Sequence, residues 1–194
     1  MMKYPFQILV FMVLFGSYLM GQAQTPLLEW SDDYRLQPTD FKAKAPNTGQ
    51  EQSIYASCGL SYQAINVQFL FSNLNPLVHN RFNSNASWID EGNETEALLR
   101  TAKISWDIYE VSARKLRKWM HENRAKLNFT KIDAYLQQVH NEGTTLLSEY
   151  SKSRPFGRHT DHQKQLEQKV DSLLQVYEAY CKTCKKPKKV KHKK

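Results

Sequence analysis

Hydrophobic and polar residues alternate over much of the first half of the chain. The alternation covers residues 53–62 and 64–72 and is clearest in the second of these segments. Residues 77–82 have the composition of a further strand, and the turn-forming residues 73–76 precede them. A period of two residues places every second side chain on one buried face. The sequence therefore predicts a small antiparallel sheet of three or four strands.

After Trp88 the hydrophobic period lengthens to three or four residues, which is the spacing of an amphipathic helix. This period predicts a helix over residues 94–121, a second helix that is weakened near Gly143, and a third that runs to about residue 180. The inward stripe of the first helix is expected to contain Leu98, Thr101, Ser105, Ile108, Ser112, Leu116 and Trp119. We therefore expect an α+β fold, with a small antiparallel sheet packed on a long central helix and two further helices.

The beginning of the chain has the pattern of a signal peptide. Lys3 precedes an apolar run of about 14 residues, which is shorter than the roughly 20 that a membrane-spanning helix needs. Gly21 and Ala23 are small residues that suit a cleavage site, so residues 1–23 are predicted to be removed. The alternative is an uncleaved N-terminal anchor. With cleavage, no transmembrane segment is expected, and the single domain over residues 24–181 is predicted to be secreted or periplasmic.

Positive charge is concentrated at the C-terminal end. Residues 182–194 contain eight lysines and no acidic residue. Without these lysines and Lys3, 18 of the 27 basic residues remain against 19 acidic residues, so the domain itself is close to neutral. A basic face for specific nucleic-acid binding is therefore not expected. The tail is predicted to be disordered, and it is a candidate for attachment to anionic cell-surface polymers.

The three cysteines leave the disulfide pairing open. Cys181 and Cys184 either bond to each other, or one of them bonds to Cys58 and the other stays free. A thioredoxin-like role is disfavoured because the Cys-x-x-Cys motif follows a helix and does not begin one. A metal site built from the three cysteines and His192 has no recognisable spacing. Cys58, between Ser57 and Gly59, has no assigned base and is only a weak candidate nucleophile.

Several short motifs resemble one known family. Residues 98–116 follow the frame Phe-Asp-Ile-x-Glu-x-x-Ala-Arg-x-Leu at Trp106, Asp107, Ile108, Glu110, Ala113, Arg114 and Leu116. Further matching positions are Trp30, Arg35, Leu36, Asp40, Phe41, Ser87 and Trp88. Together they resemble a bacterial secreted family of unknown function whose members are described as candidate zinc-dependent proteases and carry His-Glu-x-x-His ahead of this frame. The resemblance implies a metalloprotease-like domain.

The zinc motif of that family is missing from this chain. Thr101, Ala102 and Ser105 stand where the resemblance places the two histidines and the glutamate. Zinc needs the two imidazoles as ligands and the carboxylate to accept a proton from bound water, and none of the three residues can do either. We therefore expect no zinc cofactor and a catalytically inactive relative that acts as a binding or structural module for an unknown protein or cell-surface partner. The alternatives are an active metal-dependent hydrolase with a non-standard site, and a surface-tethered protein that acts through its tail.

His162 is the vestigial candidate for the third zinc ligand that the resemblance implies. The alternative is that Thr160 and Gln163 form a capping box at the start of the third helix, with His162 between them. Neither Asp107 nor Glu110 shares a helix face with Ser105, so neither replaces a ligand. Glu110 is expected to form a weak pair with Arg114, four residues later. Ordinary polar roles are expected for the remaining isolated histidines, which are His79, His121 and His140.

Overall fold

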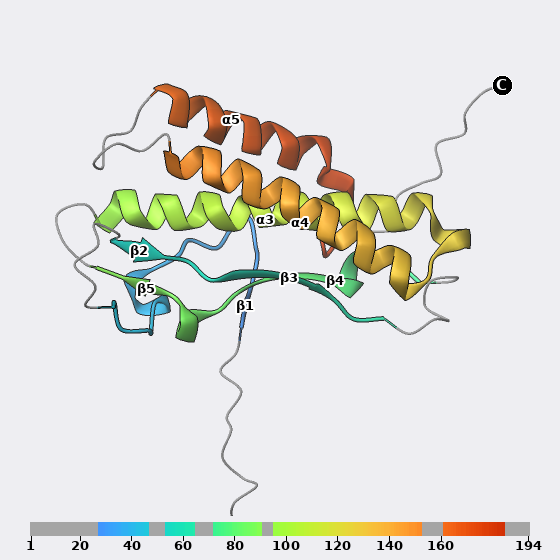
Figure 1. The fold of residues 1–194 in the computed structure, drawn as a ribbon, viewed down its shortest axis with the longest axis horizontal. Coiled ribbons are helices and arrows are strands. Elements are labelled where there is room, and N and C mark those ends of the chain that lie inside the picture. Colours follow the sequence, from blue (N-terminus) through green and yellow to red (C-terminus); the bar gives the residue numbers. More distant parts are fainter. Residues whose placement is uncertain (1–26, 47–52, 65–71, 91–94, 153–160, 185–194) are drawn as a thin grey trace, which may run out of the picture.

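A three-stranded antiparallel sheet and a two-stranded sheet lie on one side of a long central helix (Figure 1). The computed structural model describes residues 27–46, 53–64, 72–90, 95–152 and 161–184. The predicted signal peptide, most of the predicted strand over 64–72, Thr160 and the tail from residue 185, including His192, lie outside the described residues. The predicted α+β fold class is confirmed.

The strands belong to two separate antiparallel sheets. The larger sheet has the order β1 (Leu28–Glu29), β4 (Val78–Phe82), β3 (Cys58–Tyr62), and in the smaller one β2 (Ile54–Tyr55) pairs with β5 (Trp88–Ile89). The alternation over residues 53–62 covers two strands, because the chain leaves one sheet and enters the other at residues 56–57. There the backbone N–H of Ser57 donates to Ser87 Oγ at 2.9 Å, so a side chain takes the place of a partner strand.

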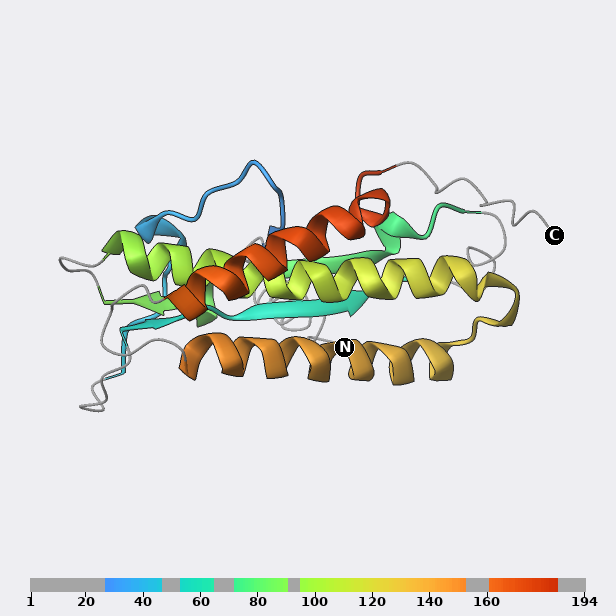
Figure 2. The same cartoon turned by 90° about the horizontal axis from the view of Figure 1, so that it is seen from above.

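Three α-helices follow the strands along the chain, close to the predicted positions. They are α3 (Thr95–Glu122), α4 (Phe129–Lys152) and α5 (Asp161–Val176). Short 3-10 helices connect the elements: η2 (Pro38–Asp40), η3 (Asn75–Leu77), η4 (Ser84–Ala86), η5 (Arg124–Lys126) and η6 (Glu178–Tyr180). Figure 2 shows α3 running along the sheet between α4 and α5.

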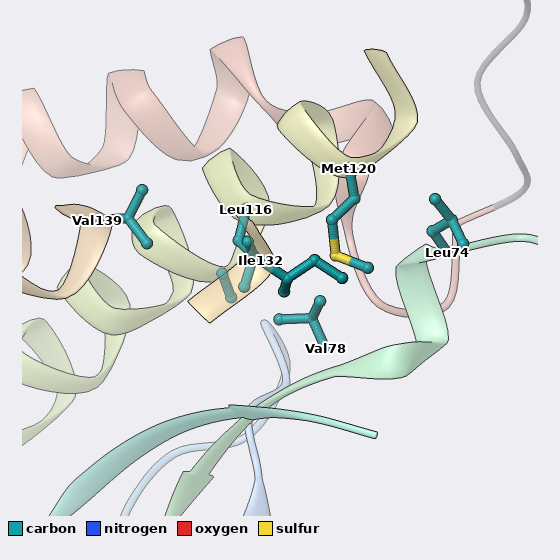
Figure 3. Close-up of a cluster of buried hydrophobic side chains, with 7 residues drawn as sticks. Leu74, Val78, Leu116, Met120, Ile132 and Val139 are labelled. Atoms are coloured by element: carbon teal, nitrogen blue, oxygen red, sulfur yellow. The ribbon is translucent and has the colours of Figure 1, made fainter. Parts of the chain in front are cut away.

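The middle of α3 is buried on all sides. Five consecutive residues, from Ile104 to Ile108, are buried because the sheet covers one side of the helix while α4 and α5 pack against the others. The predicted single inward stripe is therefore incomplete. One core cluster joins α3 and α4 to η3 and β4 (Figure 3), and its buried members are Leu74, Val78, Ala113, Leu116, Met120, Ile132 and Val139. Each large side chain of this kind stabilises the fold by about 1.5–3 kcal/mol.

The predicted weak point at Gly143 is a place of close helix packing. Helix α4 continues through Gly143, where a Cβ atom would lie 2.8 Å from Ser112 Oγ on α3. The Ser112 hydroxyl donates to the carbonyl of Val139 at 3.0 Å and therefore joins the two helices. Gly143 and Ser112 together allow α3 and α4 to approach closely at this point.

We expect Gly143→Ala to destabilise the protein although alanine favours helices by about 1 kcal/mol over glycine. The new methyl group must displace the Ser112 hydroxyl or separate the helices, so we expect a net loss of about 1–2 kcal/mol in urea denaturation. The control is Ser112→Ala combined with Gly143→Ala, in which the loss should be smaller than the sum of the two single losses. A Gly143→Ala variant as stable as the unmodified protein would contradict this account of the contact.

Candidate functional site

The positions where the family resemblance places a zinc motif are engaged in the packing of α3. Thr101 Oγ1 donates to the carbonyl of Ala97 at 2.9 Å, and Ser105 Oγ donates to the carbonyl of Thr101 at 2.8 Å. Ala102 is buried and belongs to a second core cluster, whose other buried members are Leu36, Phe41, Ile54, Phe82, Leu98 and Trp106. Hydroxyl groups bonded in this way to the preceding helical turn are satisfied within the helix.

A buried polar cluster lies beside Thr101, where α3, α4 and α5 meet. The Tyr150 hydroxyl donates to Glu167 Oε1 at 2.9 Å, and the side chains of Thr101 and Gln163 are within hydrogen-bonding reach of the same hydroxyl. Burial and the Glu167 carboxylate raise the pKa of Tyr150, while Thr101 and Gln163 act in the opposite direction. The inward position at the start of α5 therefore belongs to Gln163.

His162 lies outside this cluster. Its side chain is 54% exposed, and its Nε2 atom is 3.8 Å from Glu149 Oε1 on α4. Consecutive residues of a helix point about 100° apart, so a buried Gln163 turns His162 toward solvent. Thr160, the first residue of the predicted capping box, lies outside the described residues.

The two acidic residues of the family frame have other partners. Asp107 accepts from Trp30 Nε1 at 2.7 Å and pairs with Lys103. Glu110 pairs with Arg114 at 3.1 Å, as the sequence predicts, and also with Arg117 at 2.7 Å. The pair is buried, because Glu110 is 1% exposed and its charge is shared between two buried guanidinium groups.

The structure joins Cys181 to Cys184 in a disulfide and leaves Cys58 free. Burial, together with the charge of Asp107, raises the pKa of the Cys58 thiol, which disfavours the nucleophilic thiolate. The other two described histidines that were expected to be isolated take part in side-chain contacts. His121 Nε2 is 3.0 Å from Asn75 Oδ1, and the ring of His140 lies against Tyr109.

His79 was also expected to be isolated, but it belongs to a charged cluster. Its Nδ1 atom lies 3.1 Å from Glu29 Oε2 and 3.0 Å from Lys182 Nζ. Glu29 also pairs with Arg81 at 3.2 Å and with Lys182 at 2.7 Å. Burial and the charges of Lys182 and Arg81 lower the pKa of His79, while Glu29 acts in the opposite direction.

A cleft of about 780 Å³ lies beside this cluster, between the segment that follows β1 and the C-terminal end of α5. Two regions of the chain far apart in sequence therefore form its walls. The residues that line the cleft are Glu29, Trp30, Ser31, Asp32, Asp33, Arg114, Asp171, Leu174, Gln175, Glu178, Cys181, Lys182, Thr183 and Cys184. Sequence reasoning missed this site, and the local signal for it was the Trp-Ser-Asp-Asp run at residues 30–33.

Negative charge predominates in the cleft. Five carboxylates line it against Arg114 and Lys182, and only Glu29 among the five forms an ion pair within the part of the chain that the structure describes. Burial is the main cause that raises the pKa of Asp171; the charges of Asp107, Glu167 and Asp32 act in the same direction, and the charge of Lys103 opposes them. The surplus of carboxylates over cations in the lining gives the cleft a negative potential. The cleft therefore favours a positively charged ligand.

The indole of Trp30 forms part of the cleft wall and already contacts two cations of the protein. Lys103 Nζ lies 5.0 Å from the centre of the Trp30 ring, and Arg114 Cζ lies 5.2 Å from it. Arg114 also donates to the carbonyl of Leu174 at 2.6 Å. These contacts hold α3, α5 and the segment after β1 in a fixed arrangement around the cleft.

Within the described ranges, no group of three or more histidine, cysteine, aspartate or glutamate side chains is arranged to hold a metal ion. None of the helices in the described part of the chain is both long and apolar enough to cross a membrane. Comparisons with known protein families, with curated proteins and with solved structures found no match.

Proposed function

We propose that the protein is a non-catalytic binding module on a metalloprotease-like scaffold, and that the cleft between residues 29–33 and the end of α5 is its binding site. The observation that carries this proposal is the surplus of carboxylates in the cleft. Asp32, Asp33, Asp171 and Glu178 line it without an ion pair to any described residue. A ligand with several positive charges would compensate them.

The ligand that suits this cleft best is a lysine- or arginine-rich segment of a partner protein. The cleft is partly open to solvent and large enough for several side chains, which suits an extended segment. Basic side chains would pair with the carboxylates, and the attraction would guide association at low ionic strength. Lys103 and Arg114 lie against the Trp30 ring and have partners of their own, since Lys103 pairs with Asp107 and Arg114 pairs with Glu110.

The non-catalytic part of the proposal rests on the packing of α3. Where the family resemblance places two histidines and a glutamate, the chain has two hydroxyl groups bonded to the helix backbone and one methyl group buried in the core. The signal-peptide pattern of residues 1–23 supports a secreted or periplasmic location for this module.

The test is binding of a lysine-rich peptide to the full chain, measured by calorimetry at two salt concentrations. We expect Asp32→Asn combined with Asp171→Asn to weaken binding by about tenfold, and added salt to weaken it further. The matched control is Glu149→Gln combined with Asp161→Asn. These substitutions remove two exposed carboxylates near the C-terminal end of α4 and at the N-terminal end of α5, and neither residue lines the cleft. Equal weakening in both double variants, or no binding at low salt, would contradict the proposed site.

A further inference from the structure

The four residues that follow η6 form a small loop on one wall of the cleft. We call residues 181–184 the C-terminal loop; the Cys181–Cys184 disulfide closes it. The Cys184 carbonyl accepts hydrogen bonds from Asn73 Nδ2 at 2.8 Å and from Asn75 Nδ2 at 3.4 Å. The loop is thereby fixed to the segment that leads into β4.

A second contact fixes the other side of the loop. Lys182 Nζ lies 2.7 Å from Glu29 Oε2 and 3.0 Å from His79 Nδ1, in the charged cluster beside the cleft. Glu29 is at the end of β1 and His79 is on β4, so Lys182 connects the loop to two strands of the larger sheet. Both lysine contacts are partly exposed and therefore compete with water.

The docked loop depends on few interactions other than the disulfide. The net contribution of one hydrogen bond to stability is about equal to the free energy that it costs to order the backbone of one residue. The loop orders four residues. Against this stand the two hydrogen bonds to the Cys184 carbonyl, two backbone hydrogen bonds from the N–H groups of Cys181 and Cys184, and the partly exposed contacts of Lys182 with Glu29 and His79, so these contacts alone leave docking close to balance. The disulfide shifts that balance because it removes most conformations of the undocked loop.

The disulfide is also placed for exchange with an external thiol. Cys181 and Cys184 line the cleft, and both are only partly buried. Cys58 does not compete as an internal partner, because it packs against the core under α3 and its thiol stays protonated. Exchange therefore involves an incoming dithiol and not a rearrangement within the chain.

We propose that the Cys181–Cys184 disulfide is a redox-operated latch, which holds the C-terminal loop against Glu29 and Asn73 when oxidised and releases it when reduced. A thiolate of the reducing dithiol attacks one cysteine sulfur, the other cysteine leaves as a thiolate, and the second thiol of the reductant completes the exchange. Two electrons and two protons pass to the protein, which ends with two thiols, while the reductant ends as a disulfide. Release removes Lys182 and one wall from the cleft.

The consequence for ligand binding rests on the proposed function, whereas release of the loop does not. Without Lys182 the cleft loses one of its two positive charges, and Glu29 becomes available to a cationic ligand. We therefore expect the reduced protein to bind a lysine-rich peptide several-fold more tightly than the oxidised protein.

The test follows the full-length protein by nuclear magnetic resonance before and after reduction with dithiothreitol, with no peptide present. Reduction should raise the pKa of His79, because Lys182 leaves while Glu29 stays, and should shift the side-chain amide signals of Asn73 and Asn75. Cys181→Ser combined with Cys184→Ser should show the released state without reductant. Cys58→Ser should behave like the unmodified protein and keep its response to reduction.

A further variant separates loss of the ion pair from release of the loop. Lys182→Gln in the oxidised protein should raise the pKa of His79 and leave the Asn73 and Asn75 signals in place. Identical His79 titrations and asparagine signals in the oxidised and reduced protein would overturn the latch. Failure of peptide binding in both redox states would count against the proposed function alone, because neither of these signals depends on a ligand.

Discussion

Replacing Thr101 and Ser105 with histidine is expected to create a zinc site at the two positions where the family resemblance places the zinc-binding histidines. The two positions lie one turn apart on α3, so two imidazoles there converge on one point. We expect Glu167 to supply a third ligand, because it bonds to Tyr150, and Tyr150 lies beside Thr101. We expect zinc to bind at least about a hundredfold more tightly than to the unmodified protein, as measured by calorimetry.

Two further variants decide which residue completes that site. Adding Glu167→Gln to the double-histidine variant should remove most of the gained zinc affinity, while adding His162→Ala should leave it unchanged, since His162 is exposed and contacts Glu149. Ala102 is best left unchanged, because a glutamate there would bury a charge in the core cluster that contains Phe41 and Trp106.

The opposite result is that zinc affinity is lost on His162→Ala and kept on Glu167→Gln. It would show that the first turn of α5 is rotated so that His162 faces α3. One zinc per chain in the unmodified protein would contradict the proposal that the module is non-catalytic.

The sequence predicted the helices well because each of them repeats its apolar positions over several turns. It could not predict that the middle of α3 is buried all round, since the hydrophobic period identifies only apolar positions, and the buried face at Asp107 and Glu110 is polar. The orientation of His162 depends on the rotation of a helix about its axis near its first turn. A shift of one residue there exchanges His162 with Gln163, and local sequence does not fix helix ends that closely.

The cleft was beyond local sequence reasoning for a different reason. Its walls come from residues 29–33 and 171–184, and the contact that brings the first wall to α3 joins Trp30 to Asp107 across 77 positions of the chain. No periodic pattern marks such a pairing. The break between β2 and β3 also depends on a distant residue, because the N–H of Ser57 donates to the hydroxyl of Ser87, thirty positions away in the chain.

The largest loss of stability is expected from Arg117→Met. Arg117 is fully buried, and it pairs with Glu110 while its other hydrogen bonds go to backbone carbonyls of three segments. These carbonyls belong to Asn75, Val78 and Tyr180, at 3.1, 2.9 and 3.2 Å. The substitution leaves buried acceptors without donors and Glu110 with Arg114 as its only cation, which should lower the free energy of unfolding by about 3–5 kcal/mol.

A double-substitution cycle separates the two roles of Arg117. Glu110→Met combined with Arg117→Met removes both charges of the pair, so it should cost less than the sum of the two single substitutions in guanidinium denaturation. The loss that remains in the double variant comes from the three carbonyls, which lack their donor whether or not Glu110 is present, and from Arg114, which has lost Glu110 as its partner. Arg114→Met is the matched control: this guanidinium bonds to Glu110 and to one carbonyl only, that of Leu174, so the loss should be smaller than for Arg117. A loss below about 1 kcal/mol for Arg117→Met would mean that the segment before β4 and the segment after α5 are held to α3 by apolar packing and not by this buried network.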